Sequence, residues 1–322
     1  MTRYNTYCLG KKDAAVEKIS VSPAPAEAAS DKSAPPAKLF VIPGEITLAP
    51  GATQEFSVQA YDANGRPASI SGQPTWTASG VNATTEGGKL TVSTDNFFSA
   101  GLLTAKLGEL TGTSRVRVTS KIPLFENFEA MEEGAVPPGW VGVGAKTKIV
   151  ERQDTQVLMK LAENPSAPFM RIRGFAGPPI AGGYTVIADM LGTPKGERFK
   201  PDMGLVNSRY FLMLQGGEQL LQIESWSPIP RFRKEVPLEW KTDVWYRVKC
   251  RVDVTEKEER IRGKVWPRES EEPPKWNIDV TDPFPNREGS PGIYAYSPGT
   301  TAKSKGPEVF FDNFQVIANE KE

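Results

Sequence analysis

The stretch that decides the fold is VWYRVKCRVDV, residues 244–254. From Tyr246 to Val254, apolar residues occupy every second position and charged residues fill the positions between them. This alternation is typical of a strand with one buried face and one solvent face. Residues 260–266, RIRGKVW, repeat it after a turn at 255–259. We therefore predict an antiparallel hairpin in which Cys250 faces the core as a small hydrophobe.

The surrounding region, residues 121–318, also has the sequence features of β-strands and turns. Gly216-Gly217 separates two strand-like runs and predicts another hairpin. Pro and Gly recur too often for long helices. The stretches LFENFEAM at 124–131 and VFFDNFQV at 309–316 each carry an acidic residue and an asparagine inside an aromatic run. All-β chain of this length with long hairpins predicts a double-sheet jelly roll.

Three segments of this region carry a family resemblance: NFEAMEEGAVPPGW (127–140), EWKTDVWYRVKCRVDV (239–254) and RIRGKVWPRESEEPPKW (260–276). They resemble concanavalin-like, laminin-G-like domains, which occur with bacterial β-propeller proteins and sugar-hydrolase-like modules. In jelly rolls of that kind the first and last strands are neighbours. The resemblance therefore implies that residues 124–131 and 309–316 lie side by side.

Residues 39–120 predict a second, smaller β-sandwich. Short strand-like runs alternate with Gly, Pro and Asn-Gly turn signals, as in IPGEITLAPGATQEFSVQAYDANGRP at 42–67 and SRVRVTS at 114–120. This order of runs resembles the bacterial Ig-like group 2 domains, which are mostly spacers and adhesive modules of exported proteins. Trp76 is the one tryptophan here, and we expect it in the core.

The termini carry little folding information. Residues 12–38 are rich in Ala, Pro and Ser and predict an extended linker. Residues 1–11 predict one strand without a partner, and RYNTYCLGKKD resembles the outer strand of a quinoprotein-type β-propeller repeat. That resemblance implies a longer protein whose propeller is missing from this chain. Residues 319–322 form a tail.

Composition excludes several functions. The sequence has no histidine, which removes Ser-His and Cys-His dyads and His-ligated zinc. Lys+Arg and Asp+Glu are both 39, so we expect no nucleic-acid partner. Cys8 and Cys250 are predicted to be free thiols. Apolar runs are too short for a membrane span, and the first residues lack a signal-peptide core; the family resemblance implies a periplasmic or extracellular location.

Carboxylates are the remaining candidates for catalysis. Laminarinase-type jelly rolls carry Glu-x-Asp-x-x-Glu on one strand, and this spacing is absent. The acidic clusters at 256–259 and 269–272 fall in turns, where charge usually serves solvation. Glycoside hydrolysis needs two carboxyl groups about 5 Å or about 6.5–9.5 Å apart, which a sequence cannot supply. We therefore assign no catalytic residue.

Glu126 and Asp312 are candidate calcium ligands. Each shares its strand parity with large apolar residues, so both appear at positions that point into the core. A buried carboxylate costs several kcal/mol unless it is paired or metal-bound. If the two strands are neighbours, a structural Ca²⁺ could satisfy both acids, as in related jelly rolls. The alternatives are a β-bulge that turns the acid outward and hydrogen bonds to a loop.

Carbohydrate binding is the main functional hypothesis, because sugar sites combine flat aromatic faces with polar groups. Six of the seven tryptophans lie beyond residue 121, and we expect Trp140 and Trp245 in the core. Trp226 and Trp266 share strand faces with polar residues, which predicts a polar-aromatic surface on one sheet. The candidate ligand-binding residues are Gln222, Glu224, Trp226, Arg231, Arg233, Arg247, Lys249 and Trp266. The alternative is a solvated face whose tryptophans pack on arginine stems. A basic strip, Arg247, Lys249 and Arg251 opposite Arg262 and Lys264, could favour an acidic glycan or could equally pair with adjacent glutamates.

The sequence thus predicts an all-β chain, an Ig-like sandwich followed by a concanavalin-like jelly roll. The preferred function is a non-catalytic carbohydrate-binding module of an exported bacterial protein, with the missing propeller as a further partner. One alternative is a glycoside-processing enzyme of the sugar-hydrolase-like jelly-roll group. Another is a structural or protein-docking module.

Overall fold

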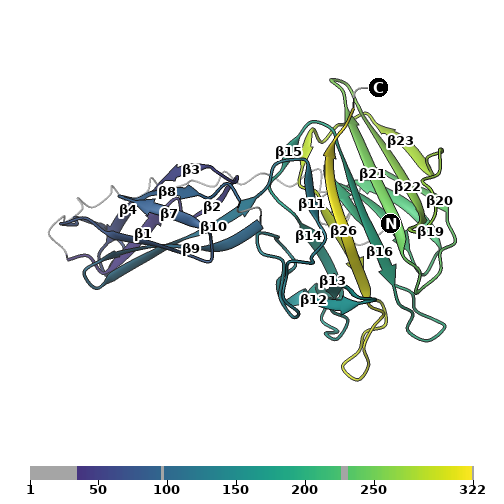
Figure 1. The fold of residues 1–322 in the computed structure, drawn as a ribbon, viewed down its shortest axis with the longest axis horizontal. Helices are drawn as coiled ribbons and strands as arrows, with labels where there is room; N and C mark the ends of the chain where they lie inside the picture. Colours follow the sequence, from purple (N-terminus) through teal and green to yellow (C-terminus); the bar gives the residue numbers. More distant parts are fainter. Residues whose placement is uncertain (1–34, 96–97, 226–230, 321–322) are drawn as a thin grey trace, which may run out of the picture.

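The computed structural model describes residues 35–95, 98–225 and 231–320. Within these ranges nearly all regular structure is β-strand, and the strands form two sandwiches that follow each other along the long axis (Figure 1). The helical elements are a 3-10 turn, η1 (Gly144–Lys146), and a single helical turn, α2 (Ala167–Met170). The predicted all-β class is confirmed. Residues 1–11 and Cys8 lie outside the described residues, so the propeller resemblance stays a prediction.

The first sandwich contains three small sheets, ordered β1-β4-β5, β2-β10-β9-β6 and β3-β8-β7. Strand β2 runs parallel to β10, and the other pairs are antiparallel. Trp76 is half-buried and packs against the core between the sheets. The strands are β1 (Lys38–Ile42), β2 (Glu45–Leu48), β3 (Thr53–Glu55), β4 (Ser57–Tyr61), β5 (Pro67–Ala68), β6 (Thr75–Ser79), β7 (Ala83–Glu86), β8 (Lys89–Val92), β9 (Phe98–Leu107) and β10 (Leu110–Thr119).

The second sandwich consists of two large sheets. The eight-stranded sheet has the order β12-β13-β26-β16-β21-β22-β23, with β11 paired to β26. Its strands are β11 (Leu124–Glu126), β12 (Thr147–Arg152), β13 (Thr155–Lys160), β16 (Tyr184–Gly192), β21 (Tyr246–Val254), β22 (Glu259–Pro267), β23 (Ile278–Asp282) and β26 (Val309–Ala318).

The six-stranded sheet has the order β14-β25-β17-β18-β19-β20. Its strands are β14 (Arg171–Phe175), β17 (Asp202–Asn207), β18 (Tyr210–Gln215), β19 (Leu220–Ser225), β20 (Arg233–Pro237) and β25 (Gly292–Tyr296). A separate short pair joins β15 (Ile180–Ala181) to β24 (Glu288–Gly289).

The predicted strand neighbours are confirmed. Strands β11 and β26 pair antiparallel, with Leu124 opposite Val316 and Glu126 opposite Phe314. The hairpin of β21 and β22 places Cys250 opposite Gly263. Cys250 is fully buried, and burial raises the pKa of its thiol to about 12. The Gly216-Gly217 turn joins β18 to β19 as expected.

The main core fills the space between the two large sheets. Trp140 packs against Phe128 and Phe314, with ring centroids 6.0 and 4.9 Å apart, which confirms its predicted core position. Trp245 is also buried, but in a smaller cluster outside the main core, against Leu191 and Phe310. Burial of such side chains stabilises the fold by roughly 1.5–3 kcal/mol each.

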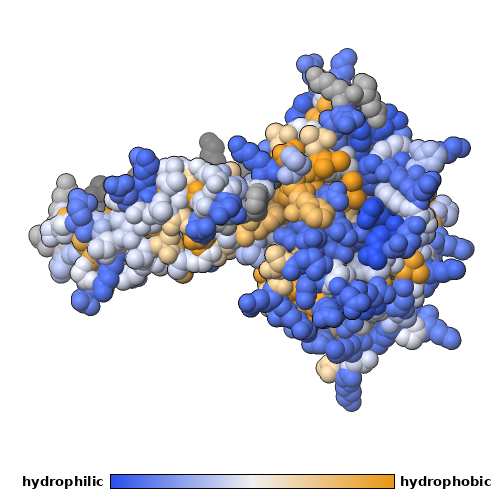
Figure 2. Space-filling model, viewed as in Figure 1, coloured by the Kyte–Doolittle hydropathy of each residue, from blue (hydrophilic) through white to orange (hydrophobic). Residues whose placement is uncertain are grey.

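The two sandwiches touch through apolar residues. Phe98 of the first sandwich packs against the core of the second. A pocket of about 430 Å³ lies at the junction, lined from both sides by residues that include Leu48, Ile122 and Pro178. Figure 2 shows apolar surface gathered in this region.

Candidate functional site

The outer face of the six-stranded sheet, turned away from the main core, carries side chains in three aligned rows. Strand alternation sends Ile172, Leu212 and Ile223 into the core and their neighbours outward. The first row is Phe175, Gly292, Val206, Phe211, Glu224 and Arg233. The second row is Arg173, Tyr294, Gly204, Met213, Gln222 and Glu235. The third holds Arg171, Tyr296, Asp202, Gln215 and Leu220. We call this surface the polar-aromatic face.

The middle of the polar-aromatic face is a packed apolar cluster of Val206, Phe211, Met213 and Tyr294. Phe211 and Tyr294 are 2% and 8% exposed and meet edge to face at 5.6 Å. Gly204 lies between Tyr294 and Met213 in the register. A Cβ atom at Gly204 would stand 2.1 Å from the Leu212 carbonyl oxygen, so a side chain is excluded there. The backbone of β18 therefore lies close against Gly204.

One side of this cluster is a chain of hydrogen bonds. Gln215 Nε2 donates to Gln222 Oε1 at 2.5 Å, and Gln222 Nε2 donates to Glu224 Oε2 at 2.8 Å. Arg233 donates to the same Glu224 oxygen through Nε and Nη2, at 3.2 and 2.9 Å. The structure thus brings together Gln222, Glu224 and Arg233, three of the candidate ligand-binding residues. Because each side chain is held by its neighbour, their remaining donors and acceptors have fixed directions.

The other side of the cluster carries arginines from β14. The Arg171 guanidinium lies over the Tyr296 ring at 4.4 Å, and the Arg173 guanidinium lies over the Phe211 ring at 5.4 Å. Burial raises the pKa of Tyr294, and a hydrogen bond with Arg171 offsets part of that rise. These contacts fix planar cations beside the apolar cluster.

A pocket adjoins each end of the polar-aromatic face. One has a volume of about 450 Å³ and is lined by Phe175, Pro179, Arg209, Arg231, Asn286, Gly289 and Ser290. The other has a volume of about 340 Å³ and is lined by Arg198, Phe199, Lys200, Asp202, Gln215, Gly217, Glu218, Tyr296 and Pro298. Phe175 belongs to the first row and Tyr296 to the third, roughly 13 Å apart along the strands at ~3.3 Å per residue. The face and its pockets thus suit an elongated ligand.

Arg231 lies at the first of these pockets and is tied to buried acids. Its Nη2 donates to Asp282 Oδ2 at 2.5 Å and to the Phe284 carbonyl at 2.6 Å. The Tyr210 hydroxyl lies 2.6 Å from Glu259 and 2.7 Å from Asp282. Burial raises the pKa of Tyr210 far above its ordinary value, and the two carboxylates add to the rise. This cluster closes one end of the sandwich.

Arg247, Lys249 and Trp266 lie elsewhere, on the outer face of the eight-stranded sheet. The expectation of one surface on one sheet is wrong, because β21 and β22 join the opposite layer from β19 and β20. Trp266 is buried at 7% exposure. Trp226 lies outside the described residues.

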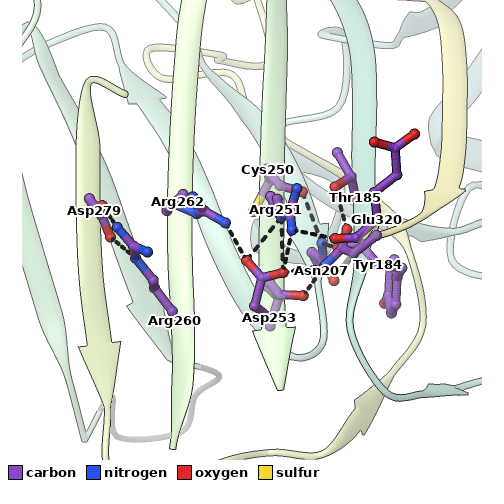
Figure 3. A network of polar contacts seen from close by, with 12 residues as sticks. Tyr184, Thr185, Asn207, Cys250, Arg251, Asp253, Arg260, Arg262, Asp279 and Glu320 are labelled. Carbon is purple, nitrogen blue, oxygen red and sulfur yellow. Dashed lines mark hydrogen bonds and ion pairs between the residues drawn. The ribbon is translucent and has the colours of Figure 1, made fainter. Parts of the chain in front are cut away.

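The basic strip on that opposite face is already neutralised. Arg247 makes a two-pronged contact with Asp189 at 2.7 and 2.9 Å, and the bond raises the pKa of Arg247. Glu272 binds Lys249 and Lys264. Figure 3 shows the same pattern nearby, where Asp253 links Arg251 to Arg262. The cations of this strip are therefore paired with nearby acids, as in the alternative given above.

Trp276 covers part of the strip, with Lys264 and Arg262 at 4.7 and 5.1 Å from the ring centroid.

Glu126 and Asp312 do not share a site. Asn313 has a φ of 49°, and the register with β16 shifts between Ile187 and Asp189. This bulge moves Asp312 to the outer face opposite Asp189, whereas Glu126 stands opposite Phe314 of the main core. The two carboxylates lie on opposite faces of the sheet, so they do not fit one shared calcium ion.

Each of these acids has its own partners. The Phe128 amide donates to Glu126 at 2.7 Å, and burial raises the pKa of Glu126. Burial raises the pKa of Asp312 to about 6, the Asn313 amide opposes this, and Asp189 adds to it. In the described part of the chain, no group of three or more acidic or cysteine side chains could hold a metal ion.

The residues of β14, β17, β18 and β25 on this face were not predicted. Alternation in Arg171–Phe175 and Tyr294–Tyr296 marks each as a strand. Their meeting depends on pairing between segments far apart in the chain, which local patterns do not reveal.

No protein-family model and no curated protein matches this sequence. Among solved structures, lectin II from Ulex europaeus is 10% identical with a TM-score of 0.41, over 61% of this chain and 99% of its own. Arcelin-5, a lectin-like defense protein from Phaseolus vulgaris, is 8% identical with a TM-score of 0.39, over 62% and 100%. A bifunctional GH43-CE protein from Bacteroides eggerthii is 14% identical with a TM-score of 0.43, over 82% and 37%. At these values the likeness carries no information on the ligand of this chain.

Proposed function

We propose that this chain is a non-catalytic carbohydrate-binding module whose glycan lies across the polar-aromatic face. The observation that carries the proposal is the pair of partly exposed rings on this face, Phe175 and Tyr296, with the chain from Gln215 to Arg233 along one side. Sugar C–H faces pack on aromatic rings, and sugar hydroxyls need fixed donors and acceptors. The face offers both, and its length suits several sugar units.

The test is a glycan-array screen of the whole chain, followed by calorimetry with the best glycan. Tyr296→Ala should weaken binding about five- to tenfold, because one aromatic contact contributes about 1 kcal/mol. Lys249→Ala, on the opposite face, is the matched control and should bind as the parent does. If Lys249→Ala loses binding and Tyr296→Ala keeps it, the glycan lies on the other sheet. No binding to any glycan would leave the structural or docking alternative.

A glycoside-processing enzyme remains the second candidate, favoured by Asp202. This carboxyl group lines the pocket of about 340 Å³, and burial raises its pKa, as a general acid requires. If the parent protein releases reducing sugar from a glycan and Asp202→Asn abolishes this release, the function is catalysis and not binding. The exported location and the propeller partner are proposals from the sequence resemblance. Across the described ranges no helix is long and apolar enough to cross a membrane.

A further inference from the structure

The pocket of about 450 Å³ at the Phe175 end of the polar-aromatic face has a wall built by a separate strand pair. Strands β15 and β24 pair with Ile180 opposite Gly289, and Pro179 and Gly289 line the pocket. A Cβ atom at Gly289 would stand 2.7 Å from the Ser208 Cα atom, in the turn that joins β17 to β18. The strand pair therefore lies directly against one end of the six-stranded sheet. We call this cavity the Phe175 pocket.

Arg231 brings hydrogen-bond donors to the Phe175 pocket, and its orientation is fixed. Its Nη2 lies 2.5 Å from Asp282 Oδ2, 2.6 Å from the Phe284 carbonyl oxygen and 3.1 Å from Asn286 Oδ1. In the described part of the chain, no acceptor lies within hydrogen-bond distance of its Nε or Nη1. The guanidinium is planar, so contacts that fix Nη2 also fix the direction of the remaining N–H groups. Those groups are available to a ligand.

The cations of the Phe175 pocket are balanced by acids. Arg209 and Arg231 are the charged residues among its lining residues. Arg209 Nη2 lies 3.2 Å from Glu288 Oε1, and Arg231 is paired with Asp282. An anionic ligand would therefore meet arginines whose charge is already compensated. A neutral ligand, which needs donors but no net charge, fits this balance better.

The other lining groups of the pocket suit a sugar ring. Phe175 is half-buried and packs against the apolar cluster of the polar-aromatic face, so its ring is held in place. Ser290 is also half-buried, and among the described residues its hydroxyl has no hydrogen-bond partner. Sugar C–H groups pack on aromatic rings, and sugar hydroxyls need donors and acceptors. The pocket offers both within one small cavity.

We infer that the Phe175 pocket binds the terminal, uncharged sugar unit of the glycan that lies on the polar-aromatic face. This inference rests on the proposed function and deepens it, because it makes the end of a neutral glycan chain the recognised feature. The wall formed by β15 and β24 stops the chain at the pocket. An internal sugar unit, which is linked on both sides, does not fit there.

Calorimetry of the whole chain with short and long glycans tests the inference. The probes are xylo-, manno-, laminari- and malto-oligosaccharides, soluble long chains of the same linkages, and any further neutral glycan that the array identifies. A module that recognises chain ends should bind as one protein molecule per glycan chain, whatever the length of the chain. A module that recognises internal units should instead bind in numbers that rise with chain length.

Variants then locate the terminal unit. Arg209→Gln should weaken binding about three- to tenfold, the range for one lost hydrogen bond. Ser290→Phe should weaken binding about tenfold or more, because the added ring takes the space of the sugar unit. Arg260→Gln, an exposed arginine with one carboxylate partner on the opposite sheet, is the matched control for Arg209→Gln and should bind as the parent does. Circular dichroism of each variant checks that the fold is intact.

Three results would overturn the inference and leave the proposed function standing. The first is a number of bound proteins that rises with chain length, and the second is unchanged affinity in both Arg209→Gln and Ser290→Phe. The third is an array on which only acidic glycans bind. If no glycan binds at all, charged or neutral, the proposed function itself is wrong.

Discussion

Lys160 gives the sharpest prediction about stability. Its side chain is fully buried, and its Nζ donates to Ser297 Oγ at 2.9 Å. No carboxylate forms an ion pair with it in the described part of the chain. Burial lowers the pKa of Lys160 from 10.5 to about 8, and the nearby Lys146 adds to the decrease. The folded state therefore carries an uncompensated charge at neutral pH.

The size of this cost follows from the pKa. A decrease of about 2.5 pKa units corresponds to about 3 kcal/mol at 1.36 kcal/mol per unit. Between pH 8 and 10.5 the unfolded chain binds more protons than the folded chain, so stability rises with pH in that window. Below pH 8 the full cost applies. Lys160→Met removes the charge and loses one hydrogen bond of about 1 kcal/mol, so it should stabilise the protein by about 2 kcal/mol at pH 7.

The assay is guanidinium unfolding at pH 7, 8, 9 and 10, followed by tryptophan fluorescence. Six of the seven tryptophans lie beyond residue 121 in the sequence, so the signal reports mainly on the unit that contains Lys160. The parent should gain stability from pH 8 to 10, and Lys160→Met should not. Lys148→Met, a half-buried lysine on the adjacent strand, should behave as the parent. A flat profile for the parent, or a Lys160→Met protein less stable than the parent at pH 7, would refute the reasoning.

Two further predictions concern the sheets. Asp312 has a folded pKa of about 6 against an ordinary 3.8, so stability should fall by up to about 3 kcal/mol as pH rises from 4 to 6. In urea titrations at pH 4 and 6, Asp312→Asn should not show this decrease in stability. If its stability decreases as much as that of the parent, other groups cause the decrease. Gly204→Ala should destabilise the protein by about 2–3 kcal/mol or more in thermal unfolding, because its Cβ would strike the Leu212 carbonyl. Gly217→Ala, with open space around its Cβ, is the control; equal effects would contradict the steric argument.

Local patterns in the sequence predicted the strands and their faces well. Alternation at Tyr246–Val254 placed Cys250 inside, and the similar stretches at 124–131 and 309–316 pair as expected. Alternation reports which face a residue occupies only while the register is unbroken. The bulge at Asn313 breaks it, and Asp312 therefore lies outside and not inside.

The candidate site was predicted only in part, for a different physical reason. Gln222, Glu224 and Arg233 sit on consecutive strands, so their meeting follows from local order. Arg173 and Tyr294 pair across a long stretch of chain, and no local signal chooses that partner. Trp266 was predicted on the wrong sheet for the same reason, because alternation does not say which sheet a hairpin joins.

The position of β26 also has a consequence for the order in which the protein folds during synthesis. Strand β26 lies between β13 and β16 in the middle of its sheet and also pairs with β11, although it follows all three in the chain. The strands of the first sandwich, by contrast, all lie within residues 38–119. On the ribosome, the first sandwich can close while the second still waits for its central strand. Until residue 318 emerges, β13 and β16 present unpaired edges, a stage at which chaperone contact would protect the nascent chain from aggregation.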